Sequence, residues 1–387
     1  MAGSLRIAIN GWMAVGLTDM GIRIGVLFGG RSAEHDVSLR SAITIMDALD
    51  PNRFEVVPIG ITRSGQWLTG GNPLQALTGA SPMFHLGEGE DASGETLDSE
   101  ATMHLVAQAG SNASAQVPGG LTDGLDIMFP ALHGPMGEDG TVQGMLELAG
   151  IPYVGSGVVG SAVAMDKAIT KTILAQAGLP QLPWRLVTRK EWHQDPSGIA
   201  AWIAETIGFP CFVKPANLGS SVGISKVKGP QDFHGAMQLA AHHDRRIVIE
   251  QGVTGREIEI AVLGNAEPIA SVAGEIVPHG EFYDYNAKYV DDTAELVIPA
   301  RIDGDMLAYM QNLAVDAFQA LDLAGLARVD FFIEKDTDQV YINEVNTIPG
   351  FTSISMYPML WEASGVPLPE LVERLVQLAL ERYAETH

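Results

Sequence analysis

Residues 22–30 read IRIGVLFGG, and this stretch decides the class of fold. A short run that is apolar apart from Arg23 and ends in two glycines is typical of a buried parallel strand that enters a loop. From Ser38, apolar residues recur at helical spacing until Pro51 stops the helix, and residues 54–61 are a second apolar run. Strand, helix and strand in this order begin a doubly wound α/β sheet.

The same sheet continues after a segment of different composition. Residues 64–124 are rich in Gly, Ser, Ala and acids with little periodicity, so we expect loops with short strands there. Residues 126–132 (DIMFPAL) are the next expected strand. A helix at 141–149 and a strand at 151–154 then complete a first domain near residue 160.

Two further α+β units are expected in the rest of the chain. The first has a helix at 161–177 and strands at 210–216, 222–228 and 246–251. The second has strands at 257–263, 268–277, 328–334 and 339–345, a helix at 305–321 and a last, amphipathic helix at 367–383. The predicted division is an N-terminal extension (1–19), an N-terminal α/β domain (20–160), a central subdomain (161–255) and a C-terminal subdomain (256–387).

Length and charge restrict the classes of function. A chain of 387 residues is too long for one compact core, which favours two or three domains. The 23 Lys and Arg residues against 47 Asp and Glu residues leave a net charge of −24. Such a field repels nucleic-acid phosphates and anionic membranes, so we predict neither as a partner. An anionic ligand would need a local cluster of Lys, Arg, backbone N–H groups and metal.

The single cysteine, Cys211, lies in the apolar run 209–213 and is predicted to be a buried core residue rather than a nucleophile. One cysteine excludes an internal disulfide framework and suits a reducing compartment. No apolar run reaches the roughly 18 residues of a membrane span. The first twenty residues lack the basic start and long apolar core of a signal peptide. We therefore expect a cytoplasmic protein.

Residues 155–160 (GSGVVG) match the GxGxxG pattern of dinucleotide-binding loops. Such a site also needs an acid about 20 residues further on. Residues 172–188 contain no Asp or Glu, so we expect a glycine-rich junction between domains rather than a dinucleotide site.

A second glycine-rich loop, residues 214–223 (KPANLGSSVG), lies between two expected strands. Its Lys214 ends the first strand, and the hairpin carries N–H and hydroxyl groups that can close over phosphates as a lid. The chain has no GxxxxGK[ST] sequence, which excludes a Walker-type loop. An ordinary β-turn would not need the preceding lysine.

Polar residues interrupt two otherwise apolar strands near the C-terminus. Alternation puts Arg328 and Asp330 on one face of the first strand, and Glu344 and Asn346 on one face of the second. Three oxygen-donor side chains at adjoining positions suit Mg²⁺. A solvated sheet edge is the alternative, but the apolar flanks indicate burial, which is costly for carboxylates without a cation.

Two acids, Glu250 and Glu257, flank the turn at residues 252–255. A carboxylate at such a hinge can bind a ribose or an adenine amino group. Their positions alone are typical of surface acids.

Taken in order, these motifs resemble the ATP-grasp superfamily and, within it, the D-alanine–D-alanine ligases. The resemblance runs from about residue 22 to 380, and residues 64–124 are the least typical stretch. Several motifs in the family's order are more specific than any one of them. The matching strings are GGRSAEHDVS (29–38), LHGPMGEDG (132–140), MDK (165–167), FVKPANLGSSVG (212–223), FYDYNAKY (282–289), RVDFF (328–332) and NEVNTIPGFTSIS (343–355).

The resemblance implies a three-domain α/β ATP-grasp fold, in which an N-terminal doubly wound parallel sheet precedes two α+β subdomains that clasp ATP. It implies ATP as co-substrate, two Mg²⁺ or Mn²⁺ ions, D-alanine as substrate and a homodimer. The implied product is D-alanyl-D-alanine for peptidoglycan precursors.

The resemblance also implies roles for individual residues. Those for ATP are Lys167, Lys214, the lid residues Ser221, Val222 and Gly223, and the adenosine ligands Glu250, Gln251, Val253 and Glu257. Those for the metals are Asp330, Glu344 and Asn346. Glu34 and His133 would contact the first D-alanine, and Lys288 and Ser355 the second. Arg328 and the Gly350 N–H would stabilise the oxyanion. Glu34, Ser220 and Tyr289 would form a hydrogen-bonded set.

Three alternatives stay open at this point. Another ATP-grasp ligase would use D-lactate or D-serine as second substrate, although Lys288-Tyr289 matches the ordinary D-alanine enzymes. A catalytically idle sensor would lack a metal ligand or a lysine, and none is missing. A dinucleotide-dependent dehydrogenase is disfavoured by the missing acid.

Overall fold

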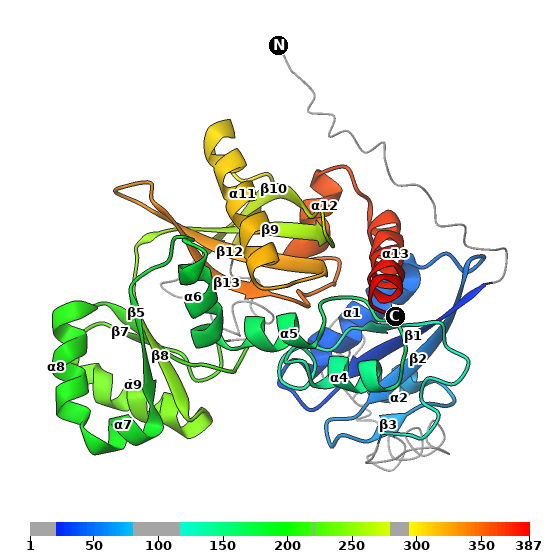
Figure 1. Cartoon of the computed structure of the whole chain (residues 1–387), viewed down its shortest axis with the longest axis horizontal. Helices are drawn as coiled ribbons and strands as arrows, with labels where there is room; N and C mark the ends of the chain where they lie inside the picture. Colours follow the sequence, from blue (N-terminus) through cyan, green and yellow to red (C-terminus); the bar gives the residue numbers. More distant parts are fainter. Residues whose placement is uncertain (1–20, 80–116, 220, 279–293) are drawn as a thin grey trace, which may run out of the picture.

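The computed structural model describes residues 21–79, 117–219, 221–278 and 294–387, which form three sheets with helices against their faces (Figure 1). The strand orders are β3-β2-β1-β4, β5-β8-β6-β7 and β11-β10-β9-β12-β13. The α/β architecture with one largely parallel and two antiparallel sheets is the predicted class.

The N-terminal sheet is built from the predicted strand–helix–strand unit. Strand β1 pairs in parallel with β2 and β4, and the short β3 adds antiparallel to β2. The elements are β1 (Ile22–Gly29), α1 (His35–Ala48), β2 (Phe54–Ile61), β3 (Trp67–Leu68), α2 (Pro73–Thr78), β4 (Ile127–Pro130) and α4 (Thr141–Leu148).

Alternation along β1 buries both faces of this sheet. Ile24, Val26 and Phe28 point into one apolar cluster with α1, whereas Leu27 packs on the opposite face with Val142 and other residues of α4. Helices on both faces make the sheet doubly wound. The carboxyl ends of β1 and β4 therefore meet at one edge, where ligands bind in folds of this kind.

The central unit is an antiparallel sheet with three helices on it. Cys211 begins a central strand, is fully buried, and has its thiol pKa raised to about 11 by burial, so the prediction of a core residue is confirmed. The elements are β5 (Trp184–Thr188), α7 (Arg189–Gln194), α8 (Pro196–Thr206), β6 (Cys211–Pro215), β7 (Ser225–Val227), α9 (Pro230–His243) and β8 (Arg246–Gln251).

The helix expected at residues 161–177 is two helices, α5 (Val158–Met165) and α6 (Lys167–Gln176). Asp166 separates them because its backbone is extended and its carboxylate accepts hydrogen bonds from the N–H groups of Ala168 and Ile169, at 3.0 and 3.1 Å. The continuous prediction was wrong because apolar periodicity runs through this cap.

Other expected elements differ in smaller ways. Residues 151–154 form a single bridge between Met128 and Tyr153 rather than a strand. The strand expected at 222–228 is reduced to β7, because Ser221 and Gly223 have positive φ angles of 58° and 73°. Strand β5 and helices α7, α8 and α9 were not predicted.

The C-terminal unit is the third sheet, flanked by helices. Four strands and the main helix follow the predicted positions to within a few residues, whereas the strand Ala294–Val297 and the helix Met356–Ala363 were not predicted. The elements are β9 (Gly255–Gly264), β10 (Ile269–Pro278), β11 (Ala294–Val297), α11 (Gly304–Ala320), β12 (Gly325–Glu334), β13 (Val340–Asn346), α12 (Met356–Ala363) and α13 (Leu368–Thr386).

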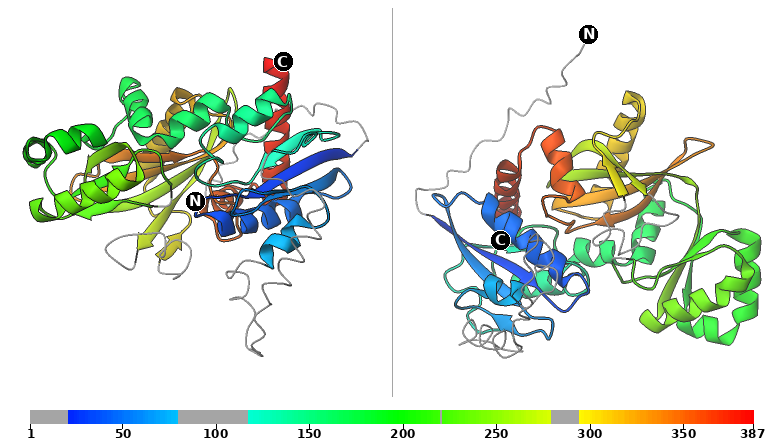
Figure 2. Two further views of the ribbon diagram at one scale, coloured as in Figure 1. Left: turned by 90° about the horizontal axis from the view of Figure 1, so that it is seen from below. Right: turned by 180° about the vertical axis from the view of Figure 1, so that it is seen from behind.

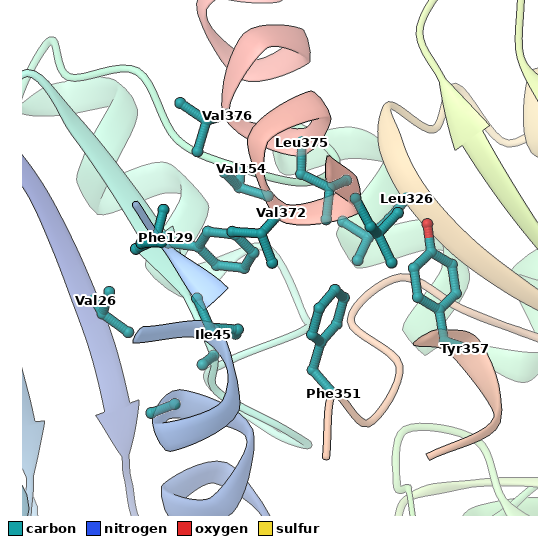
Figure 3. Close-up of a cluster of buried hydrophobic side chains, with 14 of the residues drawn as sticks. Val26, Ile45, Phe129, Val154, Leu326, Phe351, Tyr357, Val372, Leu375 and Val376 are labelled. Carbon is teal, nitrogen blue, oxygen red and sulfur yellow. The ribbon is translucent and has the colours of Figure 1, made fainter. Parts of the chain in front are cut away.

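The last helix packs back on the N-terminal sheet (Figures 1 and 2). Its apolar stripe enters a cluster with Val26, Ile45 and Phe129 from the N-terminal unit and with Leu326 and Phe351 from the C-terminal unit (Figure 3). The predicted amphipathic docking of this helix is confirmed. Its buried residues are Leu371, Val372, Leu375, Val376, Leu378 and Ala379.

The GxGxxG match at residues 155–160 lies where the N-terminal unit meets the start of β12. A Cβ added at Gly160 would lie 2.5 Å from the carbonyl oxygen of Asp322, and Ser156 Oγ exchanges hydrogen bonds with the backbone of Ala324. These glycines allow two backbones to approach closely. Within the residues that the structure describes, no helix is long and apolar enough to cross a membrane.

The shared cluster predicts a stability difference between two Leu→Ala variants. Leu375 is fully buried in it, so Leu375→Ala should lower the free energy of unfolding by about 2–5 kcal/mol. Leu148, at the end of α4, is 93% exposed, and Leu148→Ala should change it by less than about 0.5 kcal/mol. Urea denaturation of both variants measures this difference, and equal losses would contradict the packing described.

Candidate functional site

A solvent-open cleft of about 580 Å³ lies between the three units. It brings together residues that the sequence analysis singled out separately: Lys167 at the start of α6, Ser221 of the lid, and Glu344 and Asn346 on β13. Glu138, from the loop after β4, also lines it. Four of the predicted phosphate and metal residues therefore face one space, whereas Lys214 and Asp330 are not among its lining residues.

The polar residues of β12 and β13 lie side by side. Arg328 is paired with Asn346, and Asp330 with Glu344, so all four share one face of the sheet, as alternation predicted. On the other side of β12, Asp330 is paired with Glu259 of β9. Three acids thus form a row across three adjacent strands.

Arg328 compensates part of the negative charge of this row of acids in the present structure. Its Nε and Nη2 donate to the two oxygens of Asp330 at 2.7 and 2.8 Å, and Nε lies 3.0 Å from Glu259 Oε2. Burial by itself would lower the pKa of Arg328, but Asp330 and Glu259 outweigh it and raise the pKa well above its usual value. The guanidinium therefore stays charged.

The donor set at this place fits a hard divalent cation in its chemistry. Asp330, Glu344 and Asn346 offer two carboxylates and an amide oxygen on one sheet face beside the cleft. Asp330 is engaged by Arg328 and by Asn346 Nδ2, which donates to it at 3.0 Å. Among the described residues, no group of three or more His, Cys, Asp or Glu side chains is already gathered as a metal site.

Glu250 is the centre of a buried ion-pair triad. It is 1% exposed, and its two oxygens accept from Lys171 Nζ and, at 2.7 Å, from Lys214 Nζ. Burial by itself would raise the pKa of Glu250, but the two ammonium groups outweigh it and lower the pKa to about 2. The interpretation of Glu250 as a surface acid was wrong, because β8 is a central strand of its sheet.

Sequence reasoning missed Lys171. This lysine lies four residues after Lys167, on the same side of α6, and is 3% exposed. The signal in the sequence was the i, i+4 spacing of two lysines on an otherwise apolar helix face. Its partner, Glu250, comes 79 residues later and could not be assigned from that spacing.

Lys167 is hydrogen-bonded to the first part of the lid loop. Its backbone N–H donates to the carbonyl of Ala216 at 3.0 Å, and its ammonium group donates to the carbonyl of Leu218 at 2.5 Å. Burial lowers the pKa of this ammonium group, and Glu344 opposes that effect only in part. A buried ammonium group with a backbone acceptor is available to a stronger anionic partner.

The lid loop begins at the end of β6 and turns at Ser221 and Gly223. A Cβ added at Gly223 would lie 2.7 Å from His243, in addition to the strain of its φ of 73°, so the turn needs glycine. Ser220 lies outside the described residues, as do Lys288 and Tyr289.

Glu34 reaches from the N-terminal unit toward the lid. It precedes α1, and its Oε2 lies 2.6 Å from the position of a Cβ added at Gly134 and 3.4 Å from one added at Gly219. The left-handed Gly134, with a φ of 74°, makes room for this carboxylate beside His133. The carboxylate of Glu34 therefore lies close to the lid loop at Gly219.

His133 joins the N-terminal unit to the loop between β13 and α12. It is 4% exposed, donates through Nδ1 to the carbonyl of Ile348 at 3.0 Å, and lies 3.0 Å through Nε2 from Ser41 Oγ. Burial lowers the pKa of His133, but Glu138, 3.6 Å away, outweighs it, so the net direction is upward.

Gly350 and Ser355 lie in this same loop. A Cβ added at Gly350 would lie 2.9 Å from Ser355 Oγ, so a side chain there would displace the hydroxyl. Ser355 Oγ accepts from the N–H of Thr352 at 3.0 Å and precedes α12.

The remaining predicted residues lie where β8 passes into β9. Gln251 ends β8 and bonds through its N–H to the carbonyl of Pro183, Val253 lies in the connection, and Glu257 is half-buried on β9 near Lys214.

Comparisons with known proteins agree along most of the chain. The families described as D-ala D-ala ligase N-terminus and D-ala D-ala ligase C-terminus match residues 23–156 and 173–377. The D-alanine–D-alanine ligase of Geobacillus kaustophilus is 51% identical over 366 residues, which are 95% of this chain and 96% of that protein. That of Acetivibrio thermocellus is 47% identical and covers 93% and 96%.

Solved structures give the same result. The D-alanine–D-alanine ligase from Coxiella burnetii superposes with a TM-score of 0.78 at 35% identity, covering 95% of this chain and 96% of that one. The VanG D-Ala:D-Ser ligase from Enterococcus faecalis superposes with a TM-score of 0.76 at 33% identity, covering 93% and 100%. With both halves of the family matched and half of the residues identical to a relative of the same length, the chain belongs to the D-alanine–D-alanine ligase family.

Proposed function

We propose that this chain uses ATP to join two D-alanine molecules into D-alanyl-D-alanine, a step in the synthesis of peptidoglycan precursors. The observation that carries the proposal is the cleft into which Lys167, the lid and Glu344 of β13 converge, in a chain of this family. The cleft presents an ammonium group, Lys167, the polar lid residue Ser221, and oxygen donors for a cation at Glu344 and Asn346. In a protein with a net charge of −24, an anionic phosphate group requires such local groups.

In this proposal the phosphates of ATP lie between Lys167, Lys214 and the lid. Adenosine lies on the open side of the triad. Lid residues Ser221, Val222 and Gly223 would offer N–H groups to the phosphates. Glu250, Gln251, Val253 and Glu257 would bind the base and ribose.

The triad explains how Lys214 can serve a phosphate. In the present structure Lys214 is paired with Glu250, and turning it to ATP would leave a buried carboxylate without compensation if it had no other partner. Lys171 supplies that partner, because it binds the other oxygen of Glu250. Lys171 is thus the permanent counter-ion, and Lys214 the exchangeable one.

Arg328, like Lys214, has an acidic partner that it can lose and another that it keeps. Asp330, Glu344 and Asn346 would hold the two Mg²⁺ or Mn²⁺ ions, which neutralise phosphate charge when bound. Arg328 then loses Asp330 as a partner but keeps Glu259, 3.0 Å away. Its guanidinium group remains fixed beside the cleft, where it can stabilise a developing oxyanion.

The chemistry accounts for this concentration of charge. A carboxylate is a poor electrophile, so the γ-phosphoryl group is first moved to the first D-alanine, which gives D-alanyl phosphate. The amine of the second D-alanine then attacks, and the tetrahedral oxyanion is stabilised by Arg328 and by the Gly350 N–H before phosphate leaves. The lid keeps water from the acyl phosphate.

Substrate recognition in this proposal uses residues of the N-terminal unit and of the β13–α12 loop. Glu34 would bind the ammonium group of the first D-alanine, with His133 beside it. Lys288 and Ser355 would bind the carboxylate of the second. Ser220 and Tyr289 would join Glu34 in one hydrogen-bonded set. A homodimer in the cytoplasm remains our expectation.

One observation favours a second candidate, namely ligation of D-serine as the second substrate. The similar structure from Enterococcus faecalis is described as a D-Ala:D-Ser ligase. The relatives with about half of their residues identical to this chain are described as D-alanine–D-alanine ligases, which favours D-alanine.

The proposed reaction is tested by ADP release from the purified chain with Mg-ATP. We expect release that requires D-alanine, with D-alanyl-D-alanine as product, and none with L-alanine alone. Mixtures of D-alanine with D-serine or D-lactate, analysed for the mixed product, test the second subsite. A folded chain that binds ATP but releases no ADP in the presence of D-alanine would disprove the proposal.

Glu344→Gln tests the acid row. Removing the charge of a carboxylate that faces the phosphates should lower kcat at least about 100-fold and leave the far-UV circular dichroism unchanged. The control is Glu370→Gln on α13, whose side chain is 46% exposed and pairs with Arg374. Near-normal turnover of Glu344→Gln would remove Glu344 from the proposed metal site.

Lys171→Met tests the permanent counter-ion. It leaves buried Glu250 with one partner, so the free energy of unfolding at pH 7 should fall by about 3 kcal/mol. Because the pKa of Glu250 is lowered, its contribution is present above about pH 4.5 and is lost as the pH falls toward 2. Urea denaturation at pH 7 measures the loss.

Two comparisons make the Lys171 test specific. Lys190→Met, at an exposed position of α7, should change stability by less than about 0.5 kcal/mol. Adding Glu250→Gln to Lys171→Met should recover part of the loss, because the buried charge is then gone. An additive double variant would mean that Lys171 does not stabilise Glu250.

A further inference from the structure

The loop between β13 and α12, residues 347–355, carries the Gly350 N–H and is hydrogen-bonded to residues of the N-terminal unit. The N–H of Phe351 donates to Ser41 Oγ at 3.1 Å, across 310 residues of sequence. The carbonyl of Ile348 accepts from His133 Nδ1 at 3.0 Å. Both partners belong to the N-terminal unit, on α1 and just after β4.

Ser41 and His133 also bond to each other, with 3.0 Å between Ser41 Oγ and His133 Nε2. A hydroxyl group can donate or accept, so this bond persists whether the imidazole is neutral or protonated. Ser41 is fully buried and His133 is 4% exposed. Water is therefore a poor substitute for either partner, and the three bonds form one closed network.

The network holds the backbone on both sides of Gly350. Ile348 is fixed before it and Phe351 after it, and Pro349 between them has a restricted φ and no N–H. The Phe351 ring adds an anchor in the shared core, with its centroid 6.2 Å from that of Phe129 in an edge-to-face arrangement (Figure 3). Little freedom is left to the peptide group that carries the Gly350 N–H.

We propose that Ser41 is a positioning residue, which orients the Gly350 N–H by binding the N–H of Phe351 and the ring of His133. Its hydroxyl touches no substrate in this scheme. The inference rests on the proposed function for the role of the Gly350 N–H. It adds that the N-terminal unit, besides binding substrate, sets the geometry of a donor that the C-terminal unit supplies.

A donor aimed at a transition state is sensitive to small displacements. A shift of about 1 Å at a reacting centre costs on the order of 100-fold in rate. Because the nucleotide contacts lie elsewhere in the cleft, loss of Ser41 Oγ should reduce kcat and leave the KM for ATP unchanged. A purely structural serine would change stability without this split.

Ser271 supplies a matched control. It is also fully buried, and its Oγ also accepts from one backbone N–H, that of Ala261, at 3.0 Å. It lies on β10, in the interior of the C-terminal unit and away from the cleft lining. Ser41→Ala and Ser271→Ala therefore remove the same group from equally buried sites, only one of which touches the loop.

The experiment measures steady-state kinetics and amide hydrogen exchange of the full chain for wild type, Ser41→Ala, Ser271→Ala and Ser41→Thr. We expect a fall in kcat of about 10-fold to 100-fold for Ser41→Ala only, with the KM for ATP unchanged. Exchange of the peptide that contains Phe351 should be faster in Ser41→Ala only. Ser41→Thr keeps the hydroxyl group at a position that borders a small apolar cavity, so it should retain most of kcat.

Two outcomes would overturn the inference. One is an equal change in kcat for Ser41→Ala and Ser271→Ala, and the other is unchanged exchange at Phe351 in Ser41→Ala. If the wild-type chain released no ADP with D-alanine, the proposed function would fail. The exchange measurement would still decide whether Ser41 orients the loop.

Discussion

The apolar cluster shared by the N-terminal sheet, α12 and α13 is the constraint on which the rest of the structure depends. It joins residues from the first strand of the chain to residues from the last helix, with Phe351 of the β13–α12 loop between them. Burial of apolar area is favourable and has no direction, so it can hold two domains together without fixing polar contacts. The polar contacts of the site are then built across the surfaces that this cluster brings together.

Two kinds of polar contact result. Hydrogen bonds from Ser41 and His133 fix the backbone of the β13–α12 loop, while Glu34 reaches the lid at Gly219. The N-terminal unit thereby touches both the lid of the central unit and the loop of the C-terminal unit. A cleft made in this way depends on all three units being in place.

The second kind of contact concerns charge. A protein with a net charge of −24 must bind an anion with few cations. Two cations beside the cleft, Lys214 and Arg328, are paired with buried acids in this structure, whereas Lys167 is bound to the carbonyl of Leu218. Lys214 shares Glu250 with Lys171, and Arg328 lies between Asp330 and Glu259. In the proposed function each of these two cations exchanges one partner for a ligand while the remaining charges stay compensated, which would lower the cost of desolvating them.

The sequence by itself determined most strands of the N-terminal and C-terminal sheets, several helices and most of the chemistry near them. Alternation in β1 and in β12 and β13, helical spacing in α1, α11 and α13, and the motif order were local patterns, and the structure agrees with them. Local patterns failed where a polar cap broke a helix, at Asp166, and where positive φ angles shortened β7. Only the tertiary structure decided that Glu250 is buried, that Lys171 is its partner, that Glu259 extends the row of acids and that Ser41 binds Phe351. The physical reason is that burial and long-range hydrogen bonds depend on which surfaces meet, and surfaces 79 to 310 residues apart in sequence leave no periodic trace in it.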